Sequence, residues 1–229
     1  MTSGSPLRLL FAFALPLMLG NMFQQCYLIT DTLIVSRKLG VDALAALGTT
    51  DWYLYLVISV IQALTQGFAI LLAQQFGAQD RKGLRESFAQ SVLLSIASAC
   101  VLTAGAELTA PLMLHLLNVP LSIRPAASLY IMICFAGIPV QVLYNFTASV
   151  LRAFGNSRTP FAAMVVSSVL NILLDLLFVL VLPWGIAGAA AATVLSQIFA
   201  AVWCLIPVCI SFNDFCFLFL SHHIFYLLY

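Results

Sequence analysis

Long apolar runs alternate with short polar connections along most of the chain. Hydropathy and helix-breaking residues place the runs at about 9–35, 52–76, 88–114, 126–150, 160–182 and 187–210. Each run is long enough for an α-helix to cross the hydrocarbon core of a bilayer, which takes about 20 residues. The pattern therefore predicts an all-α integral membrane protein, with one bundle of six transmembrane helices over residues 1–210.

The composition supports a protein that lies in a lipid bilayer. Hydrophobic residues make up 63% of the chain and charged residues only 7%, and the mean hydropathy is +1.08. A soluble helical protein would need many more charges to cover its surface. The basic residues form no stripe, so we expect no nucleic-acid partner. The six cysteines form no Cys-x-x-Cys pair, so they indicate neither a zinc site nor a disulfide framework.

The basic residues near the ends of the runs are divided unequally between the two sides of the predicted bundle. With the N-terminus inside, the inner side carries Arg8, Arg81, Lys82, Arg85, Arg152 and Arg158. The outer side carries Arg37, Lys38 and Arg124. Because cytoplasmic loops carry the excess of Lys and Arg, we expect a cytoplasmic N-terminus. The expected location is the cell (inner or plasma) membrane, in a multi-pass arrangement.

Two carboxylates, Asp31 and Asp175, lie inside otherwise apolar runs. An acid at membrane depth is costly and therefore marks a functional site by default. Tyr27 precedes Asp31 by four residues and Asn171 precedes Asp175 by four, so each pair shares one helix face. Phenol, amide and carboxylate oxygens are suited to a hard cation or a proton.

The two acids are expected at a similar depth in the outer half of the bilayer. Asp31 lies six residues before Arg37, or ~9 Å along a helix, and Asp175 lies eight residues before Pro183, or ~12 Å. Thr193 on the last run reaches about the same level. The sequence thus predicts that these polar side chains form one cluster.

Gln62 and Gln66 are four residues apart on the second run and give it a polar face, with Thr65 beside them. Two interpretations stay open for this face. The amides either line a cavity or form hydrogen bonds between helices.

Several short motifs follow one another in an order that resembles the N-terminal half of the multidrug and toxic compound extrusion (MATE) family. They are LPL at 15–17, DTL at 31–33, LGVDALAA at 39–46, AQQFGA at 73–78, LRAFGNSRTP at 151–160, NILLD at 171–175 and WGIAGAA at 184–190. The resemblance implies one half of a twelve-helix transporter with two bundles around a central cleft. It also implies multidrug efflux rather than enzyme catalysis: antiport of cationic or amphipathic small molecules against Na⁺ or H⁺, with no other cofactor.

The resemblance also implies roles for individual residues. Asp31, Asn171, Asp175 and Thr193 would form the cation-coupling site and hold Na⁺ where Na⁺ is the coupling ion, with Tyr27 as a neighbour. The chain departs from the family because it carries only one bundle. Its last residues, 211–229, are rich in Phe and Tyr and lack Lys and Arg. We interpret them as the product of a truncation or a frameshift, so that the second bundle is missing. A genuine half-length protein that forms a homodimer is the alternative.

Three other functions compete with antiport. A lipid-linked oligosaccharide flippase of the same superfamily would have a cationic cavity, whereas the two acids predict an acidic one. An intramembrane aspartyl protease needs Tyr-Asp and Gly-x-Gly-Asp, but Thr30 and Leu174 precede the acids of this chain. A non-functional fragment that keeps the cation site remains the third alternative.

Overall fold

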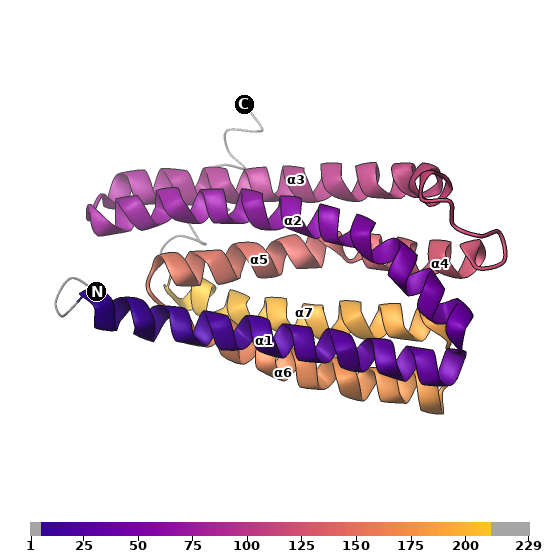
Figure 1. Ribbon diagram of the computed structural model, residues 1–229. Helices are drawn as coiled ribbons and strands as arrows, with labels where there is room; N and C mark the ends of the chain where they lie inside the picture. The colour runs from indigo at the N-terminus through magenta and orange to yellow at the C-terminus, as the bar shows by residue number, and fades with distance from the viewer. Residues whose placement is uncertain (1–5, 212–229) are drawn as a thin grey trace.

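A computed structural model describes residues 6–211, and all regular elements in this part of the chain are helices (Figure 1). They are α1 (Pro6–Leu39), α2 (Val41–Gly77), α3 (Arg81–Leu116), α4 (Arg124–Ala136), α5 (Ile138–Ala153), α6 (Arg158–Asp175), the π-helix η1 (Leu176–Val181) and α7 (Ile186–Ser211). Some side chains of α1, including that of Tyr27, lie outside the described part. So does the predicted tail beyond Ser211.

The structure confirms the predicted fold class. Four stretches are long and apolar enough to cross a membrane: Val41–Gly77, Arg81–Leu116, Arg158–Val181 and Ile186–Ile210. A fifth arises if α4 and α5, which meet at 44°, count as one broken span. The first predicted span lies in α1, where several side chains are not described. Six membrane crossings therefore stay a prediction.

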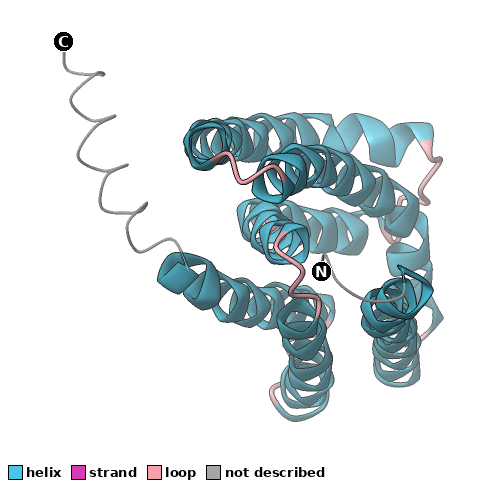
Figure 2. Ribbon diagram, turned by 90° about the vertical axis from the view of Figure 1, so that its left-hand side faces the viewer, coloured by secondary structure: helices cyan, strands magenta, loops and turns pink. Residues whose placement is uncertain are grey.

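α4 and α5 continue in one general direction, as do α6 and η1, whereas the chain reverses at each of the longer connections, which alternate between the two ends of the bundle (Figure 1). The turn at Gly40 and the connections at 117–123 and 182–185 lie at one end. Those at 78–80 and 154–157 lie at the other, together with the start of α1. Helix α7 packs against α4, α5 and α6, while α1 packs against α6 and α2 (Figure 2).

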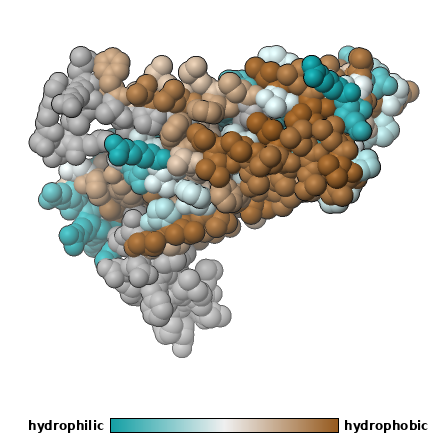
Figure 3. All heavy atoms as spheres, turned by 90° about the horizontal axis from the view of Figure 1, so that it is seen from below, coloured by the Kyte–Doolittle hydropathy of each residue, from teal (hydrophilic) through white to brown (hydrophobic). Residues whose placement is uncertain are grey.

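Three clusters of buried apolar side chains hold the helices together. One lies between α1, α2, α4 and α7 around Val35, Leu47 and Ala189, and another joins α2, α5 and α7 around Leu72 and Phe146. Much of the outer surface is also apolar, as Figure 3 shows for one face. An apolar outer surface is what contact with lipid tails requires.

The second helix extends beyond the apolar run that predicts its membrane span. The apolar run suggested a start near residue 52, but α2 begins at Val41. Gly40 has a positive φ of 85°, which glycine adopts without steric cost. This single residue reverses the chain direction between α1 and α2. The connection between α1 and α2 is correspondingly short, and residues 41–51 are helical.

The fifth predicted span changes its hydrogen-bond pattern directly after Asp175. α6 ends there and η1 follows, so that the Leu182 N–H donates to the Leu177 carbonyl, five residues back, at 2.8 Å. π-helical turns are rare and occur often at functional sites. This change in helix type places the buried acid at a junction within one continuous span.

Candidate functional site

Two buried carboxyl groups meet where α1 packs against the end of α6. Asp31 is 5% exposed and Asp175 is fully buried. Their side chains lie within hydrogen-bonding reach of each other. Two carboxyl groups can share a hydrogen bond only when one carries a proton, and two bare carboxylates this close repel each other. The pair is therefore a place for one positive charge, either a proton or a small cation.

One oxygen of each carboxyl group has no partner among the described residues. These atoms are the Oδ1 of Asp31 and the Oδ1 of Asp175. Buried polar atoms are normally satisfied by protein groups or by water, and oxygens are the ligands that hard cations prefer. No set of three His, Cys, Asp or Glu side chains in the described part is arranged to hold a metal. A cation at this pair would need amide, hydroxyl or water oxygens as well.

The amide of Asn171 connects the acid pair to α7. With Nδ2 turned toward Asp175, it donates to Oδ2 at 3.2 Å, and its Oδ1 accepts the backbone N–H of Thr193 at 3.3 Å. We assign this orientation because it satisfies both atoms of the amide. In the opposite orientation Oδ1 faces the carboxylate and Nδ2 lies 3.5 Å from Thr193 Oγ1. We call Asp31, Asn171, Asp175 and Thr193 the acid cluster.

Small residues at the start of α7 explain why Thr193 lies beside Asn171. Gly185 has a positive φ of 63° and turns the chain into α7. A Cβ on Gly188 would lie 3.0 Å from the carbonyl oxygen of Phe178, so a larger residue would push α7 and η1 slightly apart. Ala189 is fully buried in the same contact. Small residues at this position thus allow close packing between α7 and η1.

Tyr27 lies on α1 one turn before Asp31. Its side chain is outside the described part of the structure. The role expected for Tyr27 as a neighbour of the acids therefore stays a prediction.

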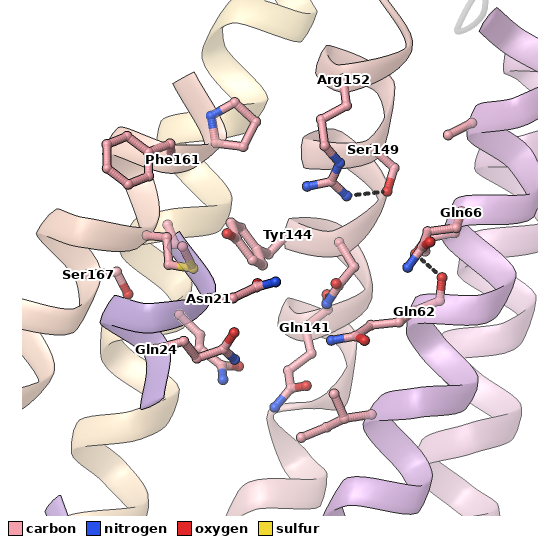
Figure 4. A pocket seen from close by; sticks show the side chains of 18 of the residues that line it. Asn21, Gln24, Gln62, Gln66, Gln141, Tyr144, Ser149, Arg152, Phe161 and Ser167 are labelled. Atoms are coloured by element: carbon pink, nitrogen blue, oxygen red, sulfur yellow. Dashed lines mark hydrogen bonds between the residues drawn. The ribbon is translucent and has the colours of Figure 1, made fainter. Parts of the chain in front are cut away.

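A cavity of about 610 Å³ lies next to the acid cluster, between α1, α2, α5, α6 and α7 (Figure 4). Its volume is in the range of pockets for drug-sized molecules. Both Gln62 and Gln66 line it, as one of the two sequence interpretations expects. The cavity also reaches Asn171, which therefore belongs to both regions.

Amide side chains dominate the polar lining of the cavity. They are Asn21, Gln24, Gln62, Gln66, Gln141, Asn145, Asn171 and Gln197. Most of these amides were not predicted to line a cavity, although the spacing of two of them indicates a polar helix face. Gln141 and Asn145 are spaced by four residues in an apolar run, as Gln62 and Gln66 are. Such spacing places both side chains on one helix face.

The charge predicted for the cavity was wrong. The lining residues that the structure describes include no carboxylate, and Arg152 is the charged side chain among them. Asp31 and Asp175 do not contribute because they are buried between α1, the end of α6 and their neighbours. The charge of the cavity therefore does not count against a flippase.

Comparison with known proteins assigns the chain to a family. The model of the MatE family matches residues 16–177. The chain belongs to the MATE family. It is 37% identical over 196 residues to the probable multidrug resistance protein YpnP of Bacillus subtilis. The matched region covers 86% of this chain and 44% of that relative. This result confirms the resemblance that the sequence motifs carry.

Solved MATE structures agree with the fold. A crystal structure of MATE in the bent conformation matches with a TM-score of 0.81 at 28% identity, over 88% of this chain and 45% of that one. A MOP superfamily transporter from Pyrococcus furiosus matches with the same TM-score and identity, over 88% and 44%. For that Pyrococcus transporter, the reverse polarity of its binding pocket suggests a different function. The chain thus spans about half the length of the proteins it matches.

Proposed function

We propose that this chain forms one half of a cation-coupled antiporter that exports amphipathic small molecules. Membership of a family of multidrug transporters supports the general class. The observation that carries the proposal is the position of Asn171, which lines the cavity and also lies 3.2 Å from Asp175. A ligand in the cavity and a cation at the acid pair would both act on this one amide.

The amide offers a physical basis for coupling. With a proton shared between Asp31 and Asp175, its Nδ2 faces the remaining negative charge as a donor. With Na⁺ at the acids, the opposite orientation would present Oδ1 as a cation ligand. Since Asn171 also borders the cavity, each orientation offers the ligand a different surface. Two ligands that favour different states of one protein are thermodynamically coupled.

The acid cluster suits either coupling ion. A shared proton satisfies the contact between the two carboxyl groups, whereas Na⁺ would use their unpartnered Oδ1 atoms. The amide and the Thr193 hydroxyl extend the set of oxygen ligands. We therefore keep both Na⁺ and H⁺ as coupling ions, in a multi-pass protein of the cell membrane with a cytoplasmic N-terminus.

The cavity needs a further wall. Gln62 and Gln66 line it but are exposed, and amides in contact with lipid are costly. We propose that a second six-helix bundle, or a second copy of this chain, covers them. A cysteine at Gln66 in a Cys-free background would report this, because a second copy on the same face gives a disulfide-linked dimer on oxidation.

A flippase for lipid-linked oligosaccharides is the second candidate. The observation that favours it is the positive charge of Arg152 in a cavity without carboxylates. The two functions differ in their dependence on an ion gradient through the acid cluster.

The test is gradient-driven efflux from liposomes that contain the chain, alone and with the C-terminal half of the Bacillus relative. Ethidium and carboxyfluorescein serve as cationic and anionic dyes, and a Na⁺ or pH gradient is imposed. We expect Asp31→Asn and Asp175→Asn to abolish the gradient-driven component. Asp42→Asn is the matched control, because Asp42 is exposed near the start of α2. Gradient-driven efflux that survives in both acid variants would refute the proposed coupling site.

A further inference from the structure

Among the described residues that line the cavity, Arg152 is the one charged side chain. It lies in the last turn of α5, next to the 154–157 connection. Its Nη2 donates to the hydroxyl of Ser149 at 2.7 Å, and Ser149 is 1% exposed (Figure 4). This bond to a buried hydroxyl holds the guanidinium at the cavity wall rather than leaving it to extend along the surface.

No carboxylate neutralises this guanidinium within the described part of the chain. The structure gives Arg152 a hydrogen bond to Ser149 but no salt bridge there. A guanidinium has five N–H donors and no acceptor, so most of its donors remain available to a ligand. A guanidinium that faces a cavity and has no carboxylate partner in the described part of the chain is suited to bind an anion.

The acid cluster is too far away to balance this charge. Arg158 begins α6 close to the cavity end that holds Arg152, and Asp175 ends it. These 17 residue steps correspond to ~26 Å along a helix. At that separation neither acid can form an ion pair with Arg152, because an ion pair needs a contact of ~4 Å or less. The remaining polar lining consists of amides and hydroxyls, which are neutral and act as both donors and acceptors.

We propose that Arg152 binds an anionic group, a phosphate or a carboxylate, of the molecule that enters this cavity. The planar guanidinium matches the paired oxygens of both groups. Tyr144 and Phe161 also line the cavity and offer aromatic faces to an apolar part of the same molecule. The ligand class is therefore an amphipathic anion. This inference rests on the proposed function only in taking the cavity as the ligand site.

The test compares two dyes with the same xanthene ring system and opposite charge. Carboxyfluorescein is the anion and rhodamine 6G is the cation, and fluorescence anisotropy measures their binding to the chain in phosphatidylcholine nanodiscs. We expect the unmodified chain to bind the anion more tightly. Arg152→Gln should weaken anion binding about tenfold, and Arg152→Lys should weaken it less because the charge remains.

Arg158→Gln is the matched control, since Arg158 is exposed and does not line the cavity. Circular dichroism and gel filtration check that the variants fold. Tighter binding of rhodamine by the unmodified chain would overturn the proposal, and so would equal effects of Arg152→Gln and Arg158→Gln. The anion preference should persist in Asp31→Asn, which separates this result from a failure of ion coupling.

Competitors identify the source of the anion. Phenyl phosphate represents a soluble molecule, and a polyprenyl phosphate in the nanodisc represents a lipid. Displacement of carboxyfluorescein by either one supports the proposal and names the source. If neither phosphate competes and carboxylates such as naphthoate also fail, the proposal is wrong.

Discussion

The acid cluster and the cavity adjoin each other along α6, yet they differ in burial and in charge. The acid cluster is closed: Asn171 and Asp175 are almost completely buried, and the two acids face each other. The cavity is open, neutral over most of its wall, and carries one positive charge from Arg152. The two acids, Asp31 and Asp175, and the guanidinium of Arg152 therefore lie in separate regions of the bundle.

This difference indicates what each region can recognise. A buried pair of carboxyl groups selects a small positive charge, because a large molecule cannot reach it. An open, amide-lined cavity accepts a larger molecule whose shape is not closely specified. Asn171 is the side chain through which we expect the two regions to communicate.

Removing one acid should have the largest effect on this comparison. Trp184 stacks on Phe178 of η1 at 4.8 Å and can report changes near Asp175. In a Trp52→Phe, Trp203→Phe background, we expect Na⁺ or acidification to change the Trp184 fluorescence. Asp175→Asn should abolish this response. An unchanged response in Asp175→Asn would show that the cation acts elsewhere.

Asn171→Ala should affect both regions at once. The variant removes the Oδ1 atom that we propose as a Na⁺ ligand, and an interaction with a charged group is worth about 1.5–3 kcal/mol, so Na⁺ affinity should fall by about tenfold or more. Displacement of a bound dye by the cation should weaken as well. Ser168→Ala is the control, because Ser168 lines the cavity but donates to the Met164 carbonyl. If Asn171→Ala alters only one of the two affinities, Asn171 does not connect the regions.

Gln66→Ala should affect the cavity alone, and by less. A neutral hydrogen bond contributes about 0.5–1.5 kcal/mol, so dye affinity should fall by a few fold while the Trp184 response stays unchanged. Gln74→Ala on the same helix serves for comparison, since Gln74 is exposed and does not line the cavity. Equal losses in both variants would argue for a general effect on α2.

Surface labelling should assign each end of the bundle to a side of the membrane without perturbing either region. Lys38 and Lys82 are exposed and lie near opposite ends. Single cysteines at these positions, in a Cys-free background, should react with an impermeant thiol reagent from opposite sides. The cytoplasmic side should be that of Lys82. If both cysteines react from the same side, α2 does not cross the membrane between Lys38 and Lys82.

Much of the fold was predictable because lipid restricts the choices. Only helices satisfy their own backbone hydrogen bonds in an apolar phase, so apolar runs of about 20 residues predict membrane helices directly. The acids were found for the same reason, since Asp31 and Asp175 interrupt apolar runs. Hydropathy does not indicate where α2 begins, because residues 41–51 mix polar and small side chains and Gly40 alone sets the turn.

The cavity was harder to predict because its lining comes from five helices. A single amide in the sequence, such as Asn21 or Gln197, does not indicate a cavity, because only helix packing decides which face of the helix borders it. Arg152 is the clearest case. Hydropathy placed it among the inner basic residues, whereas in the structure it lies within α5, bonded to the buried Ser149.

The sequence by itself determined the helical membrane class, the family motifs and the two acids, because each is encoded within one run of residues. Only the tertiary structure decided that Asp31 contacts Asp175, that Asn171 borders both regions and that the described lining of the cavity carries an arginine and no carboxylate. The physical reason is that the chemistry of a side chain fixes its charge, which the sequence shows directly. The region of the bundle that the side chain faces depends on how helices distant in the sequence pack around it.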